Sequence, residues 1–150
     1  MFQINLPSYP IKVINKNGKP TVFDPLRKRY VALTPEEWVR QHFTHFLIHH
    51  KGYPSSLLAN EITLALNGMN LRCDSVLYRR NLTPHLIIEY KAPHITINQK
   101  VFDQICRYNQ ILHVDYLIVS NGITHYCCRM DYEQQNYLFL PDIPCYKELL

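Results

Sequence analysis

The order strand, helix, strand between residues 85 and 120 constrains the fold of this 150-residue chain more than any other feature. Residues 85–92 and 116–120 are strand-like runs, and between them Asn98 precedes a stretch whose apolar residues recur at helical spacing. A strand that reaches its neighbour through a helix pairs with it in parallel, by a right-handed crossover. The chain is therefore expected to build an α/β fold around this unit.

Antiparallel strands are expected on both sides of the crossover, because the remaining strand-like runs are separated by turn sequences too short for another helix. The strands expected in this part of the chain occupy residues 71–78, 85–92, 116–120, 124–130 and 137–140. Residues 57–66, which precede them, are compatible with a strand or with a second helix. These elements predict one mixed sheet in which only the central pairing is parallel.

Two further elements are expected before the sheet. Thr34-Pro35-Glu36-Glu37 has the form of a capping box with proline at the first helical position, and it predicts a helix over residues 35–50. Asn17-Gly18, between the strand-like runs 11–14 and 21–23, predicts a hairpin. We therefore expect a single domain over residues 1–150, with residues 1–24 as an N-terminal hairpin extension.

Composition excludes several classes of protein. Apolar residues make up 47% of the chain and charged residues 19%, which suits a folded core rather than a disordered chain. The longest apolar runs fall far short of the roughly 20 residues that cross a bilayer, and no signal peptide is evident, so a cytoplasmic location without membrane contact is expected. Five cysteines without a C-x-x-C pair predict reduced thiols, and a formal charge of +4 is compatible with a polyanionic partner without demonstrating one.

Three ionisable residues stand where the central strands should be apolar: Asp74 in the first, and Glu89 and Lys91 in the second. Buried charges are costly unless they are paired or bind a metal. A symmetric loop, formed by residues 81–82 or 80–83, would place Asp74 directly opposite Glu89 and on one face with Lys91. An asymmetric loop would shift the pairing by one residue and send Asp74 to the other face.

This trio of residues suits the hydrolysis of a phosphodiester. Two carboxylates on rigid strands are the ligands that Mg²⁺ or Mn²⁺ prefers, and the backbone carbonyl of Tyr90 could add a third oxygen. Lys91 could position the attacking water and offset the charge that builds in the transition state. The alternative is a purely structural ion-pair network of Asp74, Glu89 and Lys91, and the residues alone leave both interpretations open.

The same residues resemble a nuclease signature. Asp74 and the triplet Glu89-Tyr90-Lys91 are similar to the D…(D/E)xK signature of the PD-(D/E)xK nuclease superfamily, and Gln104 and Tyr108 are similar to its QxxxY extension. The stretches 32–41 and 103–109 further resemble the N-terminal nuclease domain of type I restriction enzyme R subunits, in a stand-alone form that covers about residues 25–146.

The resemblance implies a restriction-endonuclease-like αβββαβ core, with a mixed central sheet flanked by helices. It implies a Mg²⁺-dependent DNA endonuclease that acts in restriction or other DNA processing, with Asp74 and Glu89 as metal ligands and Lys91 and Gln104 as catalytic residues. Gln104 and Tyr108, four residues apart on one helix face, would orient the site or contact the DNA backbone. A non-catalytic, nuclease-derived DNA-binding module within a larger complex is the alternative.

The resemblance also bears on partners. None of the four glycines belongs to a G-x-x-x-x-G-K-[ST] phosphate loop, so a motor or specificity function would come from a separate subunit. A homodimer is compatible with cleavage of both DNA strands by symmetry.

Four other residues have two interpretations each. Glu37 could be a metal ligand from the first helix or only the last member of the capping box. Glu61 could be an alternative ligand or a solvent-facing carboxylate. Arg79 and Arg80, like the run at 27–29, could contact DNA phosphates or remain solvated surface charge.

Overall fold

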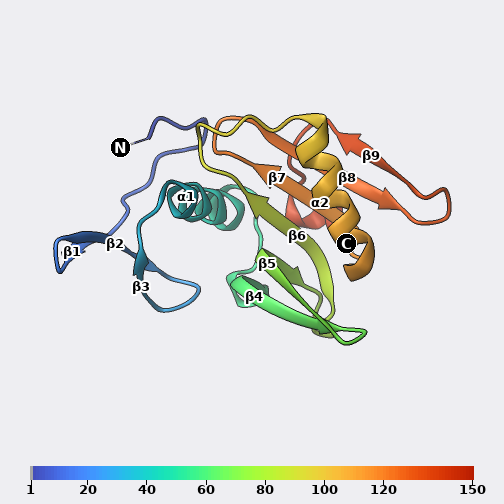
Figure 1. Cartoon of the computed structure of the whole chain (residues 1–150), viewed down its shortest axis with the longest axis horizontal. Helices are drawn as coiled ribbons and strands as arrows, with labels where there is room; N and C mark the ends of the chain where they lie inside the picture. The colour runs from blue at the N-terminus through green and yellow to red at the C-terminus, as the bar shows by residue number, and fades with distance from the viewer. Residues whose placement is uncertain (1) are drawn as a thin grey trace.

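A six-stranded mixed sheet forms the centre of the molecule, in the order β4-β5-β6-β7-β8-β9 (Figure 1). Its strands are β4 (Leu58–Leu66), β5 (Met69–Tyr78), β6 (Pro84–Tyr90), β7 (Tyr116–Ser120), β8 (His125–Asp131) and β9 (Asn136–Leu140). Only β6 and β7 are parallel, and helix α2 (Gln99–Leu112) connects them. The predicted parallel crossover within an antiparallel meander is confirmed, and β4 is a strand rather than a second helix.

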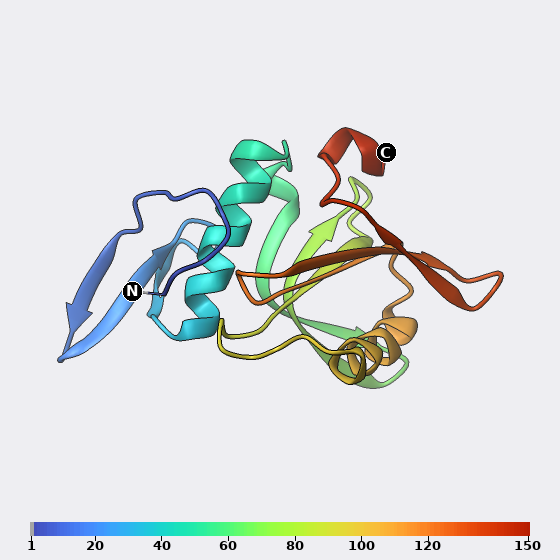
Figure 2. The same ribbon diagram turned by 90° about the horizontal axis from the view of Figure 1, so that it is seen from above.

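The computed structural model describes residues 2–150, with the side chains of residues 66, 108, 110 and 111 left out. Within it, α1 (Pro35–His50) and α2 cover opposite faces of the sheet (Figure 2). Phe43 of α1 packs in the same cluster as Ile88, whereas Phe102 of α2 packs with Ile87. Because successive strand residues point to opposite faces, β6 is buried on both sides, as expected for a central strand.

Both helices begin where their capping residues predict. Thr34 Oγ1 accepts a hydrogen bond from the Glu37 backbone N–H at 3.0 Å, and Asn98 Oδ1 accepts one from Val101 N–H at 2.9 Å. From α1 onward the elements follow the order α, β, β, β, α, β, so the predicted core is confirmed.

The N-terminal segment forms a second, three-stranded antiparallel sheet of β1 (Val13–Lys16), β2 (Lys19–Asp24) and β3 (Arg29–Ala32). The predicted β1–β2 hairpin is present, but β3 was not expected, and the extension therefore reaches residue 32 rather than 24. The turn between β2 and β3 contains the basic run, with Lys28 at a positive φ of 55°. The Asp24 carboxylate accepts a hydrogen bond from Leu26 N–H at 2.8 Å and so stabilises this turn.

The loop of the β5–β6 hairpin differs from the predicted symmetric loops. It has three residues, 80–82, because Arg79 N–H donates to the Thr83 carbonyl at 2.8 Å and Leu82 N–H donates back to the Arg79 carbonyl at 2.8 Å. Leu82 takes a positive φ of 66°, as the third residue of such loops does. This loop alone would shift the pairing of the two strands by one residue.

A β-bulge restores the predicted pairing. The register shifts between Leu77 and Tyr78, beyond which Leu77 pairs with Leu86 and Ser75 pairs with Ile88. The extra residue of the bulge compensates for the odd loop, so the strands run in the predicted register as far as Ser75. The next residue along β5 is Asp74, and its counterpart on β6 is Glu89.

The structure bears on two expectations that came from composition. All five cysteines are free thiols, and those at positions 73, 106, 127 and 128 are buried. Among the described residues, no helix combines the length and the apolar character that a membrane span requires.

Candidate metal centre

The central sheet is interrupted at Asp74. In the β4–β5 ladder Asn60 pairs with Ser75 and Ile62 pairs with Cys73, but Glu61 and Asp74 between them do not pair. Glu61 has a φ of +53°, a left-handed conformation that is uncommon for residues other than glycine. Backbone strain of this kind concentrates at functional sites, and here it faces a predicted metal ligand.

The carboxyl groups of Asp74 and Glu89 meet at this interruption. Asp74 Oδ2 accepts a hydrogen bond from Tyr90 N–H at 2.9 Å, so a side chain takes the place of a backbone partner. Glu89 interacts with both the side chain and the backbone N–H of Asp74. Glu89 Oε1 is buried, and no described group forms a hydrogen bond with it. The structure therefore brings together the two carboxylates that the sequence placed opposite each other.

Burial and the neighbouring carboxylate change the acidity of Glu89. Burial, followed by the charge of Asp74, raises the pKa of Glu89 to about 9, although Lys91 acts in the opposite direction. Glu89 therefore carries a proton at neutral pH when no cation is bound. A cation that displaced this proton would remove the repulsion between the two carboxylates.

Glu36, in the first turn of α1, also lies in the electrostatic field of this pair. Burial and the charge of Asp74 raise the pKa of Glu36, while Arg40 and Lys91 oppose the change. Glu36 is not among the predicted site residues. It offers no sequence signal of its own, because it precedes a second glutamate that is equally compatible with the capping motif.

The carboxylate of Glu37 is occupied elsewhere. It accepts hydrogen bonds from Arg27 Nη2 at 2.7 Å, from Gln41 Nε2 at 2.9 Å and from Arg40 Nη1 at 3.3 Å. Thr34 caps only the backbone N–H of Glu37, so the expected capping box is present in one direction. Three side chains thus hold the Glu37 carboxylate, whereas Glu36 Oε1 lies 4.0 Å from Arg40 Nη2 and its side chain is 45% exposed.

The carboxylate of Glu61 forms ion pairs with two arginines, so it is not simply a solvent-facing group. Its carboxylate accepts from Arg40 Nη2 at 2.5 Å and from Arg72 Nη2 at 2.6 Å. Burial favours the neutral acid, but these hydrogen bonds outweigh it and lower the pKa of Glu61. Arg40 Nη2 also lies 3.9 Å from Asp74 Oδ1, and so links the network to the site.

Glu89, Lys91 and Gln104 line one cavity of about 230 Å³, together with Arg72. Gln104 comes from α2, so the structure brings this predicted site residue to Glu89 of β6 and to Lys91, which directly follows β6. The side chain of Tyr108 lies outside the described part of the structure.

Arg79 and Arg80 are not brought to the site. They lie at the loop end of the β5–β6 hairpin, whereas Glu89 lies near the other end of β6. Arg79 Nη2 forms an ion pair with Asp115 Oδ2 at 2.5 Å, and Arg80 is exposed.

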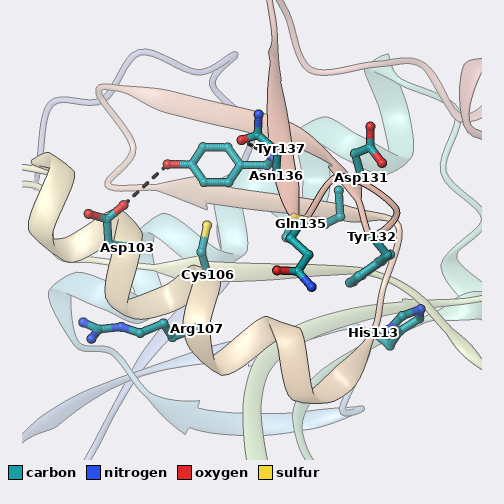
Figure 3. Close-up of a pocket in the computed structure, with 10 residues that line it drawn as sticks. Asp103, Cys106, Arg107, His113, Asp131, Tyr132, Gln135, Asn136 and Tyr137 are labelled. Atoms are coloured by element: carbon teal, nitrogen blue, oxygen red, sulfur yellow. Dashed lines mark hydrogen bonds between the residues drawn. The ribbon is translucent and has the colours of Figure 1, made fainter.

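A larger cavity, of about 700 Å³, lies between α2 and the β8–β9 hairpin (Figure 3). There Tyr137 OH donates a hydrogen bond to Asp103 Oδ1 at 3.4 Å. None of the predicted site residues lines this cavity. The candidate site is therefore placed by the carboxylate pair beside the smaller cavity, and not in this one.

The donor set of the smaller site suits a hard divalent cation. Mg²⁺ prefers oxygen ligands, and proteins usually hold it with one or two carboxylates while water or substrate completes the shell. Asp74 and Glu89 supply such a pair, and Glu89 Oε1 still lacks a described partner. Among the described residues, no three His, Cys, Asp or Glu side chains form a ready metal cage.

Comparison with known proteins identifies the family. Residues 35–144 match the family model described as the type I restriction enzyme R protein N terminus. The chain belongs to this family. Membership relates the chain to restriction nucleases, and the matched residues include both helices and all six strands of the central sheet.

One solved structure shows the same fold, and a second aligns more weakly. A fragment described as an HsdR subunit of a type I restriction enzyme from Vibrio vulnificus YJ016 aligns with a TM-score of 0.56 and 21% identity. The alignment covers 78% of this chain and 24% of that one, so the chain spans about a quarter of its relative's length. A DrdV–DNA complex aligns with a TM-score of 0.47 and 18% identity, over 77% of this chain and 11% of that one. The search of curated proteins finds no match.

Proposed function

We propose that this R-subunit N-terminal domain is a Mg²⁺- or Mn²⁺-dependent DNA endonuclease of the PD-(D/E)xK type. The observation that carries the proposal is the interruption of the sheet at Asp74, whose carboxylate accepts from Tyr90 N–H beside the buried Glu89 Oε1, which has no described partner. Lys91 and Gln104 line the cavity beside it, as the resemblance implies for catalytic residues. Membership in a restriction-enzyme family supports the same activity.

Each side chain of the site has a distinct role in this reaction. Asp74 and Glu89 would hold the cation, with Glu36 and the Tyr90 carbonyl as further oxygen donors. A bound Mg²⁺ supplies positive charge that polarises a phosphodiester oxygen. The Lys91 ammonium positions the attacking water and offsets negative charge on the phosphoryl oxygens. The water oxygen bonds to phosphorus as one P–O ester bond breaks, and a proton equivalent to one of the water's goes to the leaving oxygen, so the products are a phosphate monoester end and a hydroxyl end. Gln104 orients the reacting groups.

Cleavage of supercoiled plasmid tests the proposal. Purified protein is incubated with plasmid in Mg²⁺, Mn²⁺ or EDTA at low salt, because electrostatic DNA binding weakens as salt rises. We expect nicking that requires the metal and that falls at least about a hundredfold in Asp74→Ala and in Lys91→Ala. The charge-matched controls Asp131→Ala and Lys147→Ala, which lie outside the site cavity, should cut like the wild type.

Two other results would each contradict catalysis by this chain. If the wild type does not cut, but calorimetry shows Mn²⁺ binding that Asp74→Ala abolishes, the chain is a metal-binding module that depends on a separate partner subunit. If the chain neither cuts DNA nor binds metal, and Asp74→Asn with Lys91→Met folds normally, the three charges form a structural ion-pair network.

A further inference from the structure

The basic charge of the chain is concentrated in its N-terminal segment. Six of the 16 basic residues but only one of the 12 acidic residues lie within residues 1–32, whose formal charge of +5 exceeds the +4 of the whole chain. The single acid, Asp24, is fully buried and accepts a hydrogen bond from Asn60 Nδ2 at 3.0 Å. Solvent therefore meets basic side chains on this segment without an exposed carboxylate to balance them.

The three-stranded sheet gathers three of its lysines on one face. Cross-strand partners project to the same side of an antiparallel pair. Lys16 is the partner of Lys19, and Phe23 is the partner of Tyr30. The Lys12 ammonium lies 5.9 Å from the ring centre of Phe23 and 5.8 Å from that of Tyr30. By strand alternation, these five residues share a face.

The opposite face of this sheet is the packed one. Val22 and Asp24 alternate with Phe23 along β2, and both are completely buried. None of the described residues on the lysine face is buried. Figure 2 shows the β1–β2 hairpin projecting beyond α1, away from the six-stranded sheet.

The exposed lysine pair costs stability, since like charges directly opposite each other on neighbouring strands repel. Lys16 and Lys19 are both exposed and flank the two-residue turn of the hairpin. A polyanion laid across them would turn the repulsion into attraction.

A groove leads from this sheet to the candidate metal centre. Tyr30 lines a cavity of about 790 Å³ that also includes Arg29, Glu36 and Arg72. Arg72 lines the smaller cavity of Lys91 as well, so the two hollows meet at this side chain. Tyr30 therefore belongs both to the lysine face and to the groove that leads to the candidate metal centre.

We propose that the lysine face of the N-terminal sheet binds the phosphate backbone of duplex DNA and holds it across the groove toward the metal centre. This inference rests on the proposed function, because it takes the same DNA as the substrate of that site. Backbone contacts of this kind position a duplex without reading its sequence. The binding surface is thus a different part of the chain from Arg79 and Arg80.

A charge-neutralising pair with a matched control tests this surface. Lys16→Gln/Lys19→Gln is compared with Arg129→Gln/Lys147→Gln, whose side chains are also exposed but belong to β8 and the C-terminal segment. Fluorescence anisotropy measures binding to a labelled duplex in EDTA, so that no strand is cut, over about 50 to 200 mM salt. Circular dichroism verifies that both variants remain folded.

We expect the Lys16/Lys19 variant to bind at least about tenfold more weakly at the lowest salt. Its slope of log K against log salt should fall by about 1.8, for two lost phosphate contacts of about 0.9 each. The Arg129/Lys147 variant should bind like the wild type. Equal binding by both variants, or no duplex binding by the wild type, would overturn the inference.

The two proposals fail in different ways. Metal-dependent cleavage that Asp74→Ala abolishes, together with binding that ignores Lys16 and Lys19, removes this surface and leaves the nuclease in place. Binding that requires the two lysines, in a protein that cuts nothing in Mg²⁺ or Mn²⁺, leaves the surface in place and removes the catalytic proposal.

Discussion

Glu89 is the residue whose protonation ties the candidate site to the stability of the fold. Its pKa is about 9 in the folded protein and near the ordinary glutamate value in the unfolded chain, so the folded state binds the extra proton. Stability is then fully present below the unfolded pKa and is lost as pH rises toward the folded one. In EDTA we expect the free energy of unfolding to fall between about pH 5 and pH 9, by at most about 1.4 kcal/mol per pH unit.

The control is Glu89→Gln, which keeps the shape of the side chain without its titration. Urea denaturation followed through Trp38, the single tryptophan, measures both proteins at each pH. The difference between the two curves isolates Glu89 from histidines that titrate in the same range. Parallel curves would contradict the assignment of this proton to Glu89, whereas saturating Mg²⁺ should flatten the wild-type curve.

At the scale of elements, Arg40 joins α1 to the sheet through buried charges. Its side chain is only 3% exposed and contacts both Glu37 and Glu61. Removing one partner of a buried ion pair leaves an uncompensated charge, so Arg40→Met should lower the free energy of unfolding by about 3–5 kcal/mol. Arg72→Met removes the other arginine of Glu61, but that side chain is 75% exposed and the loss should be much smaller. Equal losses in urea denaturation would show that burial does not set the strength of this network.

At the scale of the whole molecule, the start of the chain packs against the β7–β8 turn. Asn5 N–H donates to the Gly122 carbonyl at 2.7 Å, and Gly122 has a φ of +85°. A Cβ at Gly122 would lie 2.9 Å from Ile4 Cγ2 and 3.2 Å from Val39 Cγ2. Gly122→Ala should therefore cost about 2–3 kcal/mol, from backbone strain and overpacking together.

Gly18→Ala is the matched control for the contact between the N-terminal segment and the β7–β8 turn. Gly18 has a φ of +78°, but a Cβ there would meet no atom within 4 Å. Its cost should be backbone strain alone, about 1 kcal/mol. Thermal unfolding of both variants measures the difference. Similar melting temperatures would mean that the contact between the N-terminal segment and the turn adds nothing to stability.

The comparison of sequence and structure shows which features are locally encoded. The caps of Thr34 and Asn98 depend on neighbouring residues, so the sequence predicted both helix starts. The approach of Asp74 to Glu89 was predicted from a symmetric loop that the structure lacks, and it holds because the β-bulge compensates for the three-residue loop.

The choice between Glu36 and Glu37 could not be made from sequence. Consecutive residues of a helix point about 100° apart, so Glu36 and Glu37 meet different neighbours. Which of them joins the arginine network depends on how α1 rotates against β6 when Phe43 packs into the core. That rotation is a property of the packed molecule, and no local motif records it.

The three-residue loop and the bulge of the β5–β6 hairpin each shift the strand register by one residue, and the two shifts cancel. Each alone would exchange the inner and outer faces of β5 beyond it, and together they leave these faces unchanged. A descendant sequence can therefore lose both or keep both, but a single deletion in either place would turn Asp74 away from Glu89. Loop length usually varies freely in proteins. Here the length of the β5–β6 loop is constrained, because it helps to decide on which face of the sheet Asp74 lies.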